Sequence, residues 1–283
     1  MSEHDRTVND GVAGAVSPLP RPLSALSRKL ERFQALTPLE IRKLTDLRRR
    51  MLHFEPGTDL VYEGQSARHA YVLESGWVRS YKDLVNGGRQ IINFQIPGDF
   101  LGMRSVLLRT ADYSFAAITP VIASELDGDE LRNLMIDSPR LATALLWAAS
   151  RDEAMLVEHL ASLGRRDASA RVAHFFLELG ARLSVIGRVE NGGYDCPLSQ
   201  YLLADALGMT SIHINRVLRK LRERNMLLYR DARVTILDMP ALVALAGFDK
   251  TYLDQNGTLQ GLVRDGARAG ARRVLGRRLS GPA

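Results

Sequence analysis

The residues best suited to chemistry form a polar and cationic strip between positions 211 and 219. If this stretch is helical, the apolar residues beside the strip recur at the i, i+3, i+4, i+7 spacing of a buried stripe. That stripe consists of Ile214, Val217, Leu218 and Leu221. The opposite face carries Ser211, Ile212, Asn215, Arg216 and Arg219. Such a face is what the major groove of DNA would meet.

A second, shorter helical pattern precedes this strip and ends at a glycine. Leu203 and Leu207 fall four residues apart on one face. Gly208 follows where the helix must stop, because glycine adopts the left-handed backbone at little cost. Thr210 stands one residue before the second helix, where its hydroxyl can accept from free amide groups. The pattern therefore predicts a helix-turn-helix.

The local charge separates a DNA-binding motif from two helices that merely pack in a core. Between positions 197 and 226 five residues are basic and two are acidic. All the basic ones lie on or just after the second helix: Arg216, Arg219, Lys220, Arg222 and Arg224. This local excess favours DNA binding.

Overall composition is a weaker guide than this local charge. At 283 residues and 46% hydrophobic content, two packed domains are expected. The net charge is +6, but residues 257–283 contribute six arginines and one acid. The rest of the chain is thus nearly neutral. We expect 249–283 to be a flexible basic tail, either a solvated end or a source of non-specific affinity for DNA phosphates.

Several function classes are excluded or disfavoured by what the sequence lacks. No apolar run approaches the roughly 18 residues that span a bilayer, and no signal-peptide core follows the N-terminus. We therefore expect a cytoplasmic protein without membrane contact. Cys196 is the single cysteine, which excludes an intramolecular disulfide and any multi-cysteine metal site within one chain.

The first half of the chain changes texture twice. Residues 1–22 lack periodicity and read as a disordered leader. Helical spacing follows from 23 to 36, and Thr37, Pro38 and Glu40 form a capping box that begins a second helix ending near Arg49. Short apolar segments between glycine-bearing turns then run from 51 to 126, which is typical of an antiparallel barrel or jelly roll.

A long helix with two apolar faces is predicted from 139 to 164. One face carries Leu146, Leu156 and Leu160, and the other carries Leu141, Leu145 and Met155. We expect one face to cover the β-domain and the other to meet a second copy of the chain; the alternative is that both pack within one chain. Gly164 interrupts the pattern and is expected to mark a hinge.

This order of elements resembles the Crp/Fnr superfamily of bacterial transcription regulators. Three segments of the β-part carry the resemblance in order: Gly57–Gly64 (GTDLVYEG), Val72–Arg79 (VLESGWVR) and Phe94–Gly102 (FQIPGDFLG). A hairpin predicted within 227–237 would be the wing of a winged helix. The resemblance implies an α+β fold, with an N-terminal antiparallel β-roll (jelly-roll) sensor domain, a long dimerisation helix and a C-terminal winged helix-turn-helix. We place the domains at 23–138, 139–164 and 165–248.

The resemblance also implies an effector pocket, but the key residues depart from the family pattern. The pocket would involve Gly98, Gly102, Met103, Arg104, Tyr113 and Ser114. Relatives that bind cyclic AMP carry a glutamate at the position of Met103 and an arginine near Tyr113. Methionine cannot accept a strong hydrogen bond and tyrosine brings no positive charge. Cyclic AMP is therefore not expected as the effector.

Other cofactors of the family are also disfavoured. A single cysteine cannot hold an iron–sulfur cluster, and a haem would need His53 or His69 as an axial ligand. Neither histidine has the neighbours of a metal site, which also argues against an enzyme on a cupin-like barrel. Cys196 precedes the helix-turn-helix, so its oxidation is a hypothetical redox switch. Replacing it with serine would then abolish any peroxide sensitivity of DNA binding.

For DNA, the resemblance assigns Arg216 to a guanine of the half-site. A guanidinium can bond guanine O6 and N7 together. Many relatives have a glutamate where this chain has Ile212, which can instead touch a thymine methyl. Base contacts are expected from Ser211, Ile212, Asn215 and Arg216. Phosphate contacts are expected from Ser199, Gln200, Thr210, His213 and Arg219.

The sequence thus predicts a homodimeric regulator that reads a palindromic operator through a recognition helix near 211–222. If it activates transcription, RNA polymerase is a further partner. The alternative function is a small-molecule-binding regulatory module that acts on a protein partner without DNA. Neither reading requires a metal or an enzymatic activity.

Overall fold

The computed structural model describes residues 23–253 except 67, 68 and 109. The leader predicted at 1–22 and positions 254–283 of the predicted tail lie outside the described residues.

Two short helices open the described chain, α1 (Ala25–Glu31) and α2 (Pro38–Leu47). The predicted capping box is confirmed, because the Thr37 hydroxyl accepts from the Glu40 amide at 3.2 Å and Glu40 accepts from the Thr37 amide at 2.7 Å. Helix α2 ends two residues before the predicted Arg49.

Two antiparallel four-stranded sheets form the β-roll, in the orders β1-β8-β3-β6 and β2-β7-β4-β5. The strands are β1 (Arg50–Phe54), β2 (Asp59–Val61), β3 (His69–Ser75), β4 (Val78–Asp83), β5 (Arg89–Gln95), β6 (Phe100–Leu101), β7 (Ser114–Ala117) and β8 (Val121–Asp127). A short helix, α3 (Met103–Leu108), follows β6. Leu73, Val78, Leu101 and Phe115 fill the space between the sheets. The predicted antiparallel jelly roll is confirmed.

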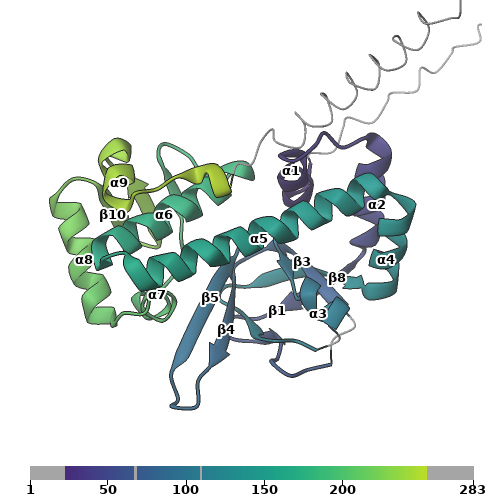
Figure 1. Ribbon diagram of the computed structural model, residues 1–283, viewed down its shortest axis with the longest axis horizontal. Coiled ribbons are helices and arrows are strands. Elements are labelled where there is room, and N and C mark those ends of the chain that lie inside the picture. Colours follow the sequence, from purple (N-terminus) through teal and green to yellow (C-terminus); the bar gives the residue numbers. More distant parts are fainter. Residues whose placement is uncertain (1–22, 67–68, 109, 254–283) are drawn as a thin grey trace, which may run out of the picture.

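Helix α4 (Gly128–Asp137) leads into α5 (Pro139–Arg165), which runs the length of the molecule beside the β-roll (Figure 1). Leu141, Leu145 and Met155 on its inner face are buried, as predicted. The helix ends at Arg165, one residue after Gly164, where the Arg166 amide bonds to the Ser162 carbonyl at 3.2 Å, and the next helix begins at Ala168. The two helices therefore separate close to the expected position, and the action of Gly164 as a hinge stays a prediction.

The C-terminal unit begins with α6 (Ala168–Val185). It continues through β9 (Gly193–Asp195), α7 (Gln200–Leu207), α8 (Ser211–Glu223), β10 (Leu227–Arg230), β11 (Arg233–Ile236), α9 (Met239–Ala246) and a 3-10 turn, η1 (Lys250–Tyr252). The predicted wing hairpin is β10–β11, and β9 extends it to a three-stranded sheet. This arrangement confirms the predicted winged helix-turn-helix.

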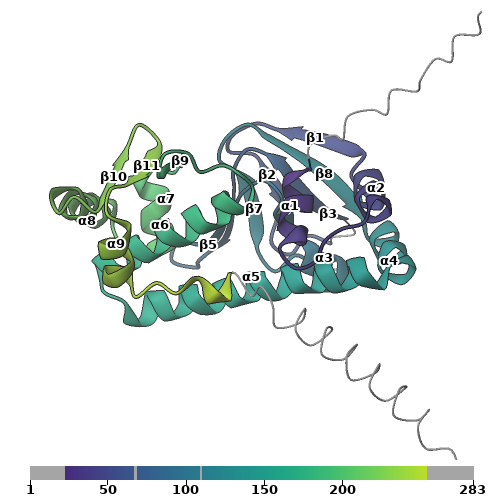
Figure 2. The same cartoon turned by 90° about the horizontal axis from the view of Figure 1, so that it is seen from above.

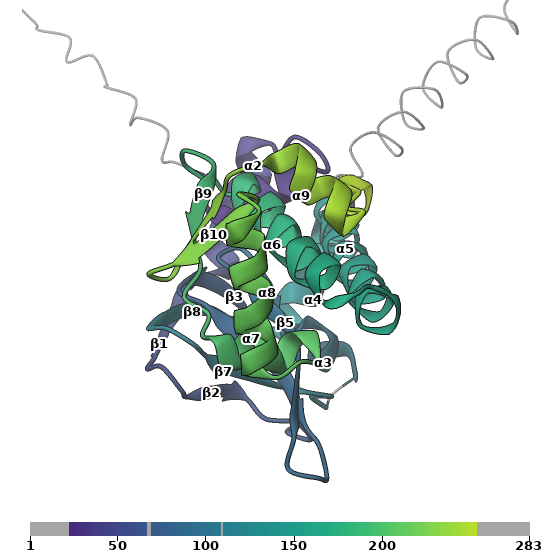
Figure 3. The ribbon, with the colours of Figure 1, turned by 90° about the vertical axis from the view of Figure 1, so that its left-hand side faces the viewer.

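The β-roll and the C-terminal unit share a continuous hydrophobic core. Trp77 and Phe94 of the β-roll belong to the same buried cluster as Phe176 and Leu203 of the C-terminal unit. The rings of Phe94 and Phe175 meet edge to face, with centroids 5.8 Å apart. Viewed from the end of the molecule, α7 lies against β5, and α8 lies in front of α7 (Figure 3).

A buried ion cluster ties the two units to the N-terminal helix. The Asp99 carboxylate, in the loop before β6, accepts hydrogen bonds from the Ile96 amide and the Arg182 guanidinium, each at 2.8 Å. Both of these bonds go to Oδ2 of Asp99, and Lys29 of α1 pairs with Oδ1. Arg182 also donates to the Phe94 carbonyl at 2.7 Å. Although burial opposes ionisation, the charges of Lys29 and Arg182 lower the pKa of Asp99.

We expect Arg182→Leu to lower the free energy of unfolding by about 3–5 kcal/mol, because it leaves the buried Asp99 short of a partner. Urea titration followed by circular dichroism measures this change. Arg132→Leu is the control, since the Arg132 side chain is 69% exposed and pairs with the exposed Asp129. The control should lose about 0–1 kcal/mol. Equal losses in the two variants would contradict the role given to Arg182.

Candidate nucleic-acid interface

The turn between α7 and α8 has the geometry that the sequence predicts. Gly208 ends α7 in the left-handed conformation, with φ 62° and ψ 43°. Ser199 and Thr210 each begin a helix, and their hydroxyls accept hydrogen bonds at 3.2 Å from the amides of Leu202 and His213, respectively. Both helix starts are therefore set by local side-chain chemistry.

Helix α8 separates a buried face from an exposed one. Ile214, Val217 and Leu221 are buried in the shared core, and Leu218 is partly buried against it. On the other side Ile212 is 74% exposed, and His213, Asn215, Arg216 and Arg219 are also exposed; Ser211 is half-buried. The helix lies at the outer end of the molecule, away from the β-roll (Figure 1). The outward strip is thus accessible to a large partner.

The side chains predicted to read bases are not engaged within the protein. Arg216 and Asn215 make no hydrogen bond or ion pair with any residue that the structure describes. The Arg219 guanidinium lies 3.7 Å from the Glu223 carboxylate, and both side chains are 62% exposed. An exposed pair of this kind contributes little and is readily exchanged for another anion. Because Arg216 has no partner among the described residues, its guanidinium can turn to a base edge.

Residues suited to phosphate contact lie at the start of α7 and at the wing. Ser199 is exposed just before α7, and Gln200 is half-buried in its first turn. Sequence reasoning missed Tyr201, which is 74% exposed in the same turn, and Arg230, which is exposed at the wing tip. The signal for Tyr201 was its place outside the apolar stripe of α7. The wing tip itself is a tight turn in which Asp231 and Ala232 have φ of 52° and 54°.

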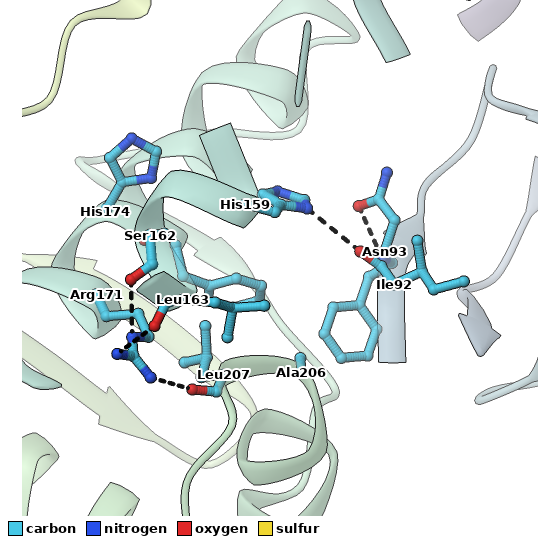
Figure 4. Close-up of a pocket in the computed structure, with 11 residues that line it drawn as sticks. Ile92, Asn93, His159, Ser162, Leu163, Arg171, His174, Ala206 and Leu207 are labelled. Carbon is cyan, nitrogen blue, oxygen red and sulfur yellow. Dashed lines mark hydrogen bonds between the residues drawn. The ribbon is translucent and has the colours of Figure 1, made fainter. Parts of the chain in front are cut away.

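Arg171 of α6 holds the helix-turn-helix against the end of α5, a role that the sequence did not reveal. Its guanidinium donates to the carbonyls of Ser162, Leu163 and Arg166 at 3.0–3.1 Å. It also donates to the Leu207 carbonyl, the last of α7, at 2.7 Å (Figure 4). One side chain thus bonds to carbonyls at the ends of two helices, where intrahelical partners run out.

His159 makes a second link between α5 and its neighbours. One ring nitrogen lies 3.2 Å from the Ile92 carbonyl of β5 (Figure 4), and the other lies 2.8 Å from the Glu178 carboxylate of α6. Burial alone would lower the pKa of His159, but the Glu178 charge outweighs it and raises that pKa. Hydrogen bonds of His159 therefore link α5 to both the β-roll and the C-terminal unit.

The residues predicted for an effector pocket have different surroundings. Tyr113 lines a narrow cavity of about 50 Å³ between the β-roll and α5, together with Gln95 and Asp152. Burial raises the pKa of Tyr113 to about 12. Met103 instead lines a hollow between α3, α4 and α5. The narrow cavity has room for one or two water molecules, not for a nucleotide.

The other four of these residues serve the framework. Gly98 approaches α1 so closely that a Cβ there would lie 2.7 Å from the Ala25 carbonyl carbon, and Gly102 turns the chain with φ 69°. Arg104 pairs with Asp112 at 2.8 Å. The Ser114 hydroxyl accepts from the Glu63 amide at 3.0 Å.

The outer face of α5 is apolar and open. Leu146 and Leu160 are 65% and 73% exposed, as expected of a face that meets a partner. Leu156 is half-buried and lines the narrow β-roll cavity, so it belongs to the inner side. Val157, which the sequence reasoning missed, is 61% exposed. No described element covers this face (Figure 2).

The candidate redox and ligand residues do not gather into a reactive site. Cys196 is buried, and burial raises its thiol pKa to about 12. A protonated, buried thiol is inert, which favours a plain buried thiol over the hypothetical redox switch. His53 is exposed on β1, and His69 lies 3.8 Å from Asp127. Within the described ranges no group of three His, Cys, Asp or Glu residues could hold a metal.

The helices in the part of the chain that the structure describes include none with the length and hydropathy of a membrane span.

Comparison with known proteins matches both halves of this architecture. Residues 51–138 match the model of the cyclic nucleotide-binding domain, and residues 170–245 match that of the Crp-like helix-turn-helix domain. The solved structure of FixK2 from Bradyrhizobium japonicum superposes with a TM-score of 0.64 at 26% identity, covering 70% of this chain and 98% of that one.

Curated relatives agree with the structural match. The nitrogen fixation regulation protein FixK of Bradyrhizobium diazoefficiens is 30% identical over 75% of this chain and 88% of its own length. The transcriptional activatory protein AadR of Rhodopseudomonas palustris is 30% identical over 69% of this chain and 80% of its own. These relatives are transcription regulators rather than enzymes. The chain belongs to the Crp/Fnr superfamily of DNA-binding transcription regulators.

Proposed function

We propose that this regulator binds a palindromic operator as a homodimer, with α8 in the major groove. The observation that carries the proposal is the Arg216 guanidinium, exposed beside Asn215 and unengaged by any described residue. Ser211, Ile212, Asn215 and Arg216 contact bases, and Ser199, Gln200, Thr210, His213 and Arg219 contact phosphates. Two-fold symmetry separates the two α8 helices by about one DNA turn, roughly 34–36 Å.

The outer face of α5 forms the dimer interface in this proposal. Leu146, Val157 and Leu160 place exposed apolar area along one helix, where a symmetry-related α5 can cover it. The same stripe on both copies gives a self-complementary contact. An effector in the β-roll, if one acts, is not cyclic AMP bound through Met103 and Tyr113, and no metal cofactor is needed. The protein acts in the cytoplasm, with RNA polymerase as a partner if it activates transcription.

Arg216→Ala should weaken binding to the operator by about 1–3 kcal/mol and leave binding to random DNA nearly unchanged, because it removes a base contact. The operator is first found by footprinting genomic fragments, and affinities are then measured by fluorescence anisotropy at two salt concentrations. Arg219→Ala is the control on the same helix: it should weaken both DNAs alike and reduce the salt slope by about 1. Equal loss on both DNAs for Arg216→Ala would refute base readout.

Leu160→Asp should shift the protein from dimer to monomer, because it places a charge in the apolar face of α5. Sedimentation equilibrium measures the dissociation constant, which should rise about tenfold or more. Leu39→Asp is the control, since Leu39 on α2 is also exposed but lies away from this face. A Leu160→Asp variant that dimerises like the wild type would place the interface elsewhere.

A further inference from the structure

A cavity of about 550 Å³ lies between α5 and the C-terminal unit, where α6, α9, β9 and the segment 248–253 line it. Small-molecule sites commonly have volumes of about 300–1,000 Å³. Its walls are mainly apolar and include Leu177, Val185, Ile236, Val243 and Phe248. It shares no lining residue with the narrow β-roll cavity. Figure 2 shows the surrounding elements.

One wall of this cavity carries a buried arginine that forms no ion pair with any described residue. Arg151 of α5 is 7% exposed, and its Nε donates to the Leu253 carbonyl at 3.1 Å. Its guanidinium also lies 5.9 Å from the centre of the Trp147 ring. Among the described residues no carboxylate forms an ion pair with it. A buried charge is costly unless it is paired and hydrogen-bonded.

The other charged residues of the lining are two basic and one acidic. Arg32 and Lys250 also line the cavity, and Asp249 is its acidic lining residue. Burial and the nearby charge of Arg182 lower the pKa of Arg151, and the charges of Asp99, Asp152 and Glu178 offset this only in part. An anion placed beside Arg151 would add to that offset. The apolar walls, in turn, would contact a hydrocarbon or aromatic body.

We infer that this cavity binds an amphipathic organic carboxylate, whose carboxylate meets Arg151 and whose alkyl or aryl body lies against α6 and α9. A small inorganic anion would leave the apolar walls uncovered, and a neutral molecule would leave Arg151 unpaired. The ligand would contact α5, α6 and α9 together. Nothing in this inference depends on which DNA the protein reads, so a binding assay without DNA tests it.

The first experiment compares four probes on the full-length protein by isothermal titration calorimetry: octanoate, acetate, inorganic phosphate and 1-octanol. Octanoate should bind about tenfold or more tightly than each of the others, because only octanoate supplies both a carboxylate and an apolar body. Octanoate that binds no better than acetate or phosphate would overturn the apolar part. Octanoate that binds no better than 1-octanol would overturn the charged part.

Three variants then locate the site. Arg151→Met should weaken octanoate about tenfold or more without changing 1-octanol, whereas Arg151→Lys should retain part of the affinity. Ala181→Leu, on the α6 wall, should weaken both by filling space. Arg132→Met, on the distant α4, is the matched control and should change neither. Unchanged octanoate affinity in Arg151→Met overturns the inference; if that variant does not fold, unchanged affinity in Ala181→Leu does.

Discussion

Asp99 is the charge around which the two halves of this protein are joined. Its carboxylate is buried between Lys29 of α1 and Arg182 of α6, and it also accepts from the Ile96 amide. A buried carboxylate needs these partners together, so α1, the loop before β6 and α6 must meet at one point. Gly98 lets the loop come this close, since a side chain there would collide with Ala25. The orientation of the DNA-binding unit on the β-roll follows from that meeting.

Local chemistry explains what the sequence predicted well. Thr37, Gly208 and Thr210 act through residues at most four positions away, so their roles as caps could be assigned from spacing alone. The period of Ile214, Val217 and Leu221 likewise determined which face of α8 is buried. The exposed polar and cationic strip was predictable because it occupies the face opposite that stripe. The family resemblance then supplied the order of the domains, and the matched families favour the DNA-binding function over a purely protein-directed module.

Contacts between distant segments explain what the sequence could not show. Arg171 and Arg182 are ordinary helical arginines until the fold brings Leu207 and Asp99 beside them. Gly164 lies one residue before the end of α5, but its spacing does not reveal that Arg171 bonds to the carbonyls on both sides of that end. The residues predicted for an effector pocket follow a family motif, which does not show that Gly98 packs against α1 or that Arg104 pairs with Asp112. The division into domains at 138, 164 and 248 stays a prediction, because one core runs through both units.

The Arg171 clamp has a consequence for how a dimer would read DNA. The Arg171 guanidinium is bonded to the ends of both α5 and α7. The helix-turn-helix therefore cannot rotate freely about the short link at Arg166. In a dimer built on α5, the angle at which the two long helices cross would then set the distance between the two α8 helices. The length of the DNA spacer between the two half-sites would then correspond to one crossing angle of the two α5 helices. An operator whose spacer is one base pair longer or shorter would require a different crossing angle of the two α5 helices, with the same base contacts from α8.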